Sequence, residues 1–126
     1  MKTFVLLGAL NAFVAIACGA FGAHALAERL TPRLLDVWRT SAQYHLAHAL
    51  ALILVALLCE RSTGTSSTRL VNATGWLFVA GIVVFCGSLY LLAVTDRAWL
   101  GAITPLGGLC FLSGWALVAL AAVRGK

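Results

Sequence analysis

The chain has 126 residues and a net charge of +5, and its composition is 62% hydrophobic but only 10% charged. Soluble domains usually carry about 25% charged residues, so this composition excludes an ordinary soluble globule. The basic residues lie singly between apolar runs, which excludes a nucleic-acid-binding patch and is typical of membrane topology signals. We therefore expect an integral membrane protein whose surroundings are the lipid bilayer and not nucleic acid.

Four apolar runs are long enough to cross a bilayer as helices, since a spanning helix needs about 20 mostly apolar residues. These runs cover residues 3–26, 42–59, 70–94 and 103–123. Backbone polar groups must be satisfied internally within lipid, so the runs predict an all-α fold, a four-transmembrane-helix bundle, in a single domain over residues 1–126. The first run resembles a signal peptide but stays apolar through Ala23, so we expect it to remain uncleaved.

Two Thr-Pro pairs mark candidate helix starts. Thr31 is a suitable N-cap and Pro32 suits the first helical position, so the second helix is predicted to begin near Pro32, ahead of its apolar run. Thr104 and Pro105 are interpreted in the same way as the start of the last helix.

The connections between the runs carry the signal for orientation. The side that holds both termini has the basic residues Lys2, Arg61, Arg69, Arg124 and Lys126. The opposite side has Arg29, Arg33, Arg39 and Arg97. Because Lys and Arg are enriched in cytoplasmic loops, we expect both termini in the cytoplasm.

Small residues form a stripe on the first helix, at alternating spacings of four and three. The stripe consists of Gly8, Ala12, Ala15, Gly19 and Gly22. Such residues let helix backbones approach closely in lipid. The stripe predicts tight packing against a second helix of the same chain, with the interface of a homo-oligomer or larger membrane complex as the alternative.

Polar side chains within the runs gather at the end that faces the first and third connections. They include His24, Gln43, Tyr44, His45, His48 and Tyr90. His45 and His48 share a helix face, and a hairpin of the first two helices would bring His24 to a similar depth, so we predict a histidine cluster. Three roles remain open: hydrogen bonding that fixes the bundle, proton or substrate handling, and ligation of a metal or haem.

Several segments resemble a known family. They are Gly19-Ala20-Phe21-Gly22-Ala23-His24, Gln43-Tyr44-His45-Leu46-Ala47-His48, Gly87-Ser88-Leu89-Tyr90 and Thr104-Pro105-Leu106-Gly107-Gly108 with Gly114-Trp115. In this order they resemble the domain-of-unknown-function 423 family of small multi-span inner-membrane proteins. The resemblance implies a protein of four spans in a bacterial inner membrane, and it brings neither an activity nor catalytic residues.

The expected function is that of a non-enzymatic membrane component or accessory subunit of a larger complex. The chain has no nucleophile–base pair, phosphate loop or paired intramembrane carboxylates, so we assign no catalytic residue and expect no cofactor. One alternative is a small transporter or channel with the histidine end as its polar vestibule. The other is a membrane protein with a histidine-ligated metal or haem.

Overall fold

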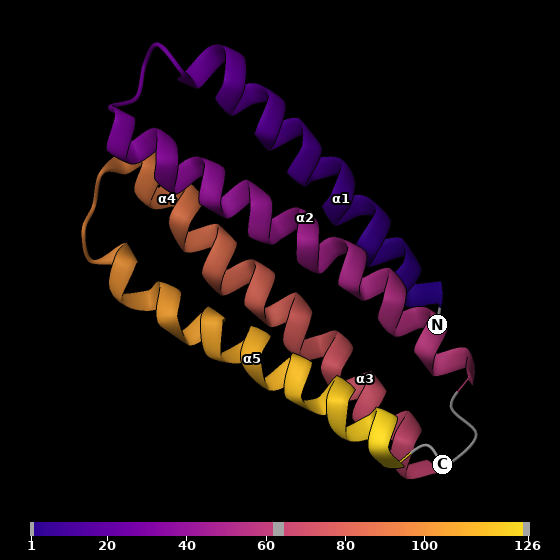
Figure 1. Cartoon of the computed structure of the whole chain (residues 1–126). Helices are drawn as coiled ribbons and strands as arrows, with labels where there is room; N and C mark the ends of the chain where they lie inside the picture. The colour runs from indigo at the N-terminus through magenta and orange to yellow at the C-terminus, as the bar shows by residue number, and fades with distance from the viewer. Residues whose placement is uncertain (1, 62–64, 125–126) are drawn as a thin grey trace.

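The computed structural model describes residues 2–61 and 65–124, and this part of the chain is helical with no strand. The elements are α1 (Lys2–Phe21), the π-helix η1 (Gly22–Leu26), α2 (Pro32–Arg61), α3 (Thr65–Gly81), the π-helix η2 (Ile82–Cys86), α4 (Gly87–Thr95) and α5 (Leu100–Arg124). Since η1 continues α1, and η2 joins α3 to α4, they form four antiparallel rods (Figure 1).

Each rod contains a segment long and apolar enough to cross a membrane. The segments are Lys2–Leu26, Pro32–Arg61, Ser66–Thr95 and Leu100–Arg124. The predicted all-α bundle of four transmembrane helices is therefore confirmed. The start of the first rod and the end of the last rod lie at the same end of the bundle (Figure 1), because an even number of antiparallel crossings returns the chain to its starting side.

Two rods form the centre of the bundle and two flank it. In an apolar 18-residue stretch of each rod, 44% of the residues are buried in α2 and in the α3–η2–α4 rod, against 17% in the α1–η1 rod and 22% in α5. In Figure 1, α1 lies beside α2, and α5 lies beside the α3–η2–α4 rod. Any residue that must bond to several helices is therefore best placed on a central rod.

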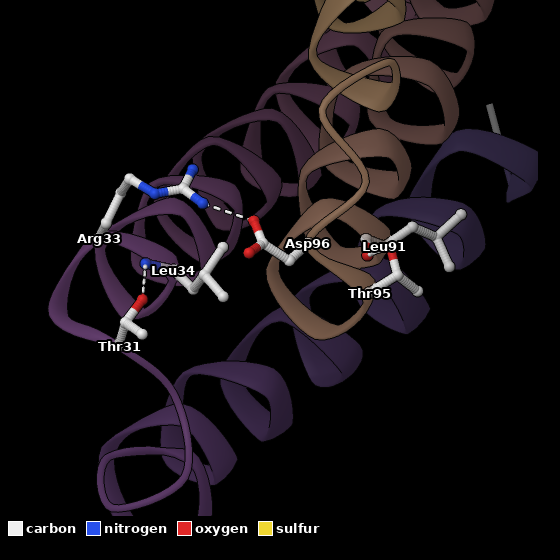
Figure 2. A network of polar contacts seen from close by, with 6 residues as sticks. All are labelled: Thr31, Arg33, Leu34, Leu91, Thr95 and Asp96. Carbon is white, nitrogen blue, oxygen red and sulfur yellow. Dashed lines mark hydrogen bonds and ion pairs between the residues drawn. The ribbon is translucent and has the colours of Figure 1, made fainter.

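One of the two predicted helix starts is right and the other is wrong. Helix α2 begins at Pro32, and the backbone N–H of Leu34 donates to Thr31 Oγ1 at 3.3 Å, as an N-cap requires (Figure 2). Helix α5 begins earlier than predicted, at Leu100, which places Pro105 inside the helix. Thr104 is not its cap, because the Thr104 hydroxyl donates back to the Leu100 carbonyl at 3.3 Å.

Phenylalanine rings from α5 and from the rod opposite it fill spaces left by glycines. Phe78 lies against Gly114. Phe111 lies in the reverse sense against Gly81. A methyl group added at Gly107 would overlap the backbone of Phe85. The two rods approach this closely because glycine at these positions has no side chain to hold them apart.

An ion pair joins α2 to the end of α4 at the side of the first and third connections. Arg33, in the first turn of α2, donates through Nη2 to Asp96 Oδ1 (Figure 2). Asp96 follows α4 in the left-handed backbone conformation, with φ of 51°, and its N–H donates to the Leu92 carbonyl. Few residues other than glycine, asparagine and aspartate adopt this conformation readily, so Asp96 both ends α4 and holds α2.

Candidate functional site

The candidate site is a polar stripe on α2, which we call the α2 stripe and define as Trp38, Ser41, His45 and His48. Spacings of three, four and three residues place these side chains along one face of the helix. All four are buried in the bundle. Together they form hydrogen bonds to each of the other three rods, as the central position of α2 permits.

The N-terminal half of the α2 stripe, Trp38 and Ser41, bonds to backbone carbonyls. The Trp38 indole N–H donates to the Cys18 carbonyl of α1 at 2.8 Å, and the Trp38 ring lies against the Tyr90 ring with centroids 4.6 Å apart. The Ser41 hydroxyl donates to the Cys86 carbonyl at the end of η2, also at 2.8 Å. These bonds fix α2 to the rods on both sides.

His45 belongs to a directed chain of hydrogen bonds between α1 and α4. The Asn11 amide nitrogen donates to the Leu7 carbonyl at 2.7 Å, which leaves Asn11 Oδ1 facing His45 Nε2 at 3.0 Å. Because that oxygen only accepts, His45 carries its hydrogen on Nε2. Its Nδ1 then accepts from the Tyr90 hydroxyl at 3.2 Å, so both ring nitrogens have partners.

His48 is held in the opposite tautomer. Its Nδ1 lies 2.8 Å from the Tyr44 carbonyl, which only accepts, so Nδ1 carries the hydrogen. Nε2 accepts from the Trp115 indole N–H at 3.2 Å, which only donates. The imidazole is stacked on Phe111, with centroids 3.5 Å apart and planes 12° apart. The ring is therefore uncharged and fixed in position by three contacts.

The structure does not bring His24 to the other two histidines, so the predicted three-histidine cluster is wrong. His24 lies exposed on η1, whereas His45 and His48 are buried on α2. Of the other predicted members, Tyr90 bonds to His45, Tyr44 takes part through its carbonyl and ring, and Gln43 is exposed outside the network. Position in the apolar runs predicts the depth of His24 in the membrane, but it does not predict whether its side chain points toward α2.

The arrangement disfavours metal or haem ligation by these histidines. Ligation requires the lone pair of an imidazole nitrogen. The lone pairs of His45 Nδ1 and His48 Nε2 already accept hydrogen bonds from Tyr90 and Trp115. Across residues 2–61 and 65–124, no three His, Cys, Asp or Glu side chains are grouped as metal ligands would be.

The small-residue stripe of α1 packs on α2 at some positions only. Gly8 lies against Ala49 and Ile53, and Gly22 lies against the Trp38 ring. Ala15 is also buried and Ala12 half-buried. Gly19 was predicted to face a helix, but it is exposed, and no atom of another helix lies within 4 Å of the point a Cβ would occupy. Helix α1 and η1 therefore contact α2 closely at Gly8 and Gly22 but not at Gly19.

A groove of about 310 Å³ lies beside His48, between α2 and α5, and Phe85 of η2 contributes to its lining. We call it the aromatic groove. It is lined by Tyr44, His48, Phe85, Gly108, Phe111, Leu112 and Trp115. Tyr44, Leu112 and Trp115 are exposed, so the groove opens on the outer surface of the bundle, where lipid would lie.

Sequence reasoning missed several members of this network. The sequence-based predictions assign no role to Ser41 and no bond from Asn11 or Trp115 to a histidine, whereas the structure shows all three in the network. The spacing of the α2 stripe could have identified Ser41, because it falls between Trp38 and His45 on the same helical face. No sequence signal indicates which residues of other helices meet that face.

The chain is similar to a family of membrane proteins of unknown function. The family model described as "Protein of unknown function (DUF423)" matches residues 18–108. The UPF0382 membrane protein YwdK of Bacillus subtilis is 50% identical over 124 residues, 98% of each chain. A UPF0382 membrane protein of Staphylococcus epidermidis is 44% identical over the same share of each chain, and SSP2132 of Staphylococcus saprophyticus is 45% identical over 95% of this chain and 96% of its own. No solved structure matches the chain.

Proposed function

We propose, from the premise that the chain belongs to the DUF423 family of membrane proteins, that it is a non-enzymatic accessory subunit of a larger complex in the bacterial inner membrane. The observation that carries this proposal is the use of the buried polar groups. The nitrogens of both buried imidazoles bond to the protein itself. A general base or metal ligand needs a free lone pair directed at a substrate or ion.

The outer rods supply the surface through which such a subunit would associate. On α1, residues spaced by three and four present large apolar side chains outward. They are Leu6, Leu10, Phe13 and Ile16, with exposed fractions of 60%, 54%, 75% and 61%. A helix with one face on α2 and one face free is suited to pack against a helix of another protein.

The orientation we propose has both termini in the cytoplasm. Five basic residues are on the side of the termini and four on the other, and the positive-inside rule counts Lys and Arg and not net charge. A reporter that is active only in the cytoplasm should therefore work when fused after Lys126. A reporter active only outside the cytoplasm should work when inserted between Thr95 and Leu100.

The accessory role is tested by photocrosslinking in native membranes. A photoreactive amino acid replaces Phe13 on the outer face of α1, and in a control it replaces Val83, which is exposed on η2. We expect a protein adduct of one defined mass from position 13, formed in proportion to the amount of this chain, and lipid adducts from position 83. Lipid adducts alone at both positions would contradict the proposal.

A further inference from the structure

The aromatic groove has the composition of a binding site for a flat ring. Five of its seven lining residues carry rings: Tyr44, His48, Phe85, Phe111 and Trp115. The planes of Tyr44 and His48 are 13° apart, and those of Tyr44 and Phe111 are 24° apart. A flat ring that lies against these nearly parallel faces can stack on them in the offset arrangement that aromatic pairs favour. The volume of about 310 Å³ matches the lower end of small-molecule pockets, roughly 300–1,000 Å³.

The walls of the groove are held in place by contacts among the lining residues themselves. His48 is fixed by the Tyr44 carbonyl, the Trp115 indole and the Phe111 ring. Gly108 adds no side chain, and even a Cβ there would lie 3.8 Å from Phe85. A groove whose walls are already ordered loses little conformational entropy when a ligand binds.

One hydrogen-bond donor of the groove has no partner in the described part of the chain. It is the hydroxyl of Tyr44, whose side chain is 45% exposed. The other polar atoms of the lining, on His48 and Trp115, bond to the protein. The chemistry that fits is therefore a flat ring with an acceptor oxygen at its edge. An acyl chain has no acceptor to offer this hydroxyl.

From these observations we propose that the aromatic groove binds the carbonyl-bearing head ring of a membrane-soluble quinone, with the Tyr44 hydroxyl donating to a ring carbonyl. The tail of such a lipid would leave through the open side of the groove into the bilayer. This is a binding role that stands apart from the proposed assembly role, because the outer face of α1 does not line the groove.

The test compares two substitutions on α5 in lipid nanodiscs, with decylubiquinone as the probe. Leu112 lines the groove and Leu109 does not, yet both are exposed on the same helix, at 69% and 60%. Leu112→Trp should fill the groove without disturbing the bundle, and Leu109→Trp is its matched control. We expect decylubiquinone to raise the melting temperature of the wild type and of Leu109→Trp, and to bind Leu112→Trp at least about tenfold more weakly.

Two further measurements separate the proposed occupant from others. Tyr44→Phe should weaken decylubiquinone binding about five- to tenfold, the loss that one hydrogen bond brings. n-Decane, which has the tail without the ring, should give no saturable stabilisation. Equal stabilisation of all variants, or an effect of n-decane that equals that of decylubiquinone, would overturn the proposal, the latter in favour of an acyl chain. The proposal would also be overturned, in favour of a second copy of the chain, if the wild type formed a dimer that decylubiquinone did not stabilise and if Leu112→Trp dissociated that dimer.

Discussion

Substitution of Gly107 by alanine should separate α5 from the rod opposite it. The added methyl group would overlap the backbone of Phe85, and a backbone cannot turn aside as the end of a side chain can. The two rods must then move apart, which also loosens the fit of Phe78 at Gly114 and of Phe111 at Gly81. Overpacking of this kind costs about 1–3 kcal/mol, against about 1 kcal/mol gained because alanine favours a helix more than glycine does.

The neighbouring glycine provides the matched control for this prediction. A Cβ at Gly108 would lie 3.8 Å from Phe85 Cδ2, an ordinary contact, so Gly108→Ala should be neutral or stabilising by up to about 1 kcal/mol. The free energy of unfolding of both variants is measured by titrating SDS into mild-detergent micelles and following circular dichroism. We expect Gly107→Ala to unfold at a lower SDS fraction. Unfolding of the two variants at the same fraction would refute the close approach at Gly107.

Three other substitutions test the polar contacts, each by the same unfolding titration. Trp115→Phe removes the donor to His48 Nε2 and should cost about 0.6 kcal/mol, the average for hydrogen bonds between membrane helices, and at most about 1.7 kcal/mol. No loss would show that this bond contributes nothing. Asn11→Leu leaves the N–H of His45 without its acceptor and should cost about 1–3 kcal/mol, whereas an unchanged stability would mean that His45 finds another partner. Asp96→Ala should be about 1–2 kcal/mol less stable than Asp96→Asn, because both lose the ion pair to Arg33 but only alanine resists the left-handed conformation; equal stability would contradict that origin.

The sequence was sufficient to predict the four helices, because length and hydropathy decide what can cross a bilayer. It also predicted the start of α2, since a threonine followed by proline supplies a local hydrogen bond and a fixed φ at the same point. The same reasoning failed at Thr104 and Pro105. The chain ahead of them already forms a helical turn from Leu100, so Pro105 stands in the second turn, where its missing N–H removes a single backbone hydrogen bond.

The site could be predicted only in part, because spacing within a helix does not identify the partner of each side chain. His45 and His48 share a face of α2, yet one bonds to Asn11 and Tyr90 and the other to Trp115. Gly19 has the spacing of a contact residue, yet no atom of α2 lies within 4 Å of the point that its Cβ would occupy. These outcomes are set by the arrangement of the rods.

The buried histidines hold the bundle together, and every one of their ring nitrogens bonds to the protein. Solid-state ¹⁵N NMR of histidine-labelled protein in lipid tests it most directly, because the ring-nitrogen shifts distinguish the two tautomers. We expect His45 to carry its hydrogen on Nε2 and His48 to carry its hydrogen on Nδ1, and we expect Trp115→Phe to move only the His48 signals. The same tautomer at both positions, or displacement of either signal by added Zn²⁺, would contradict it.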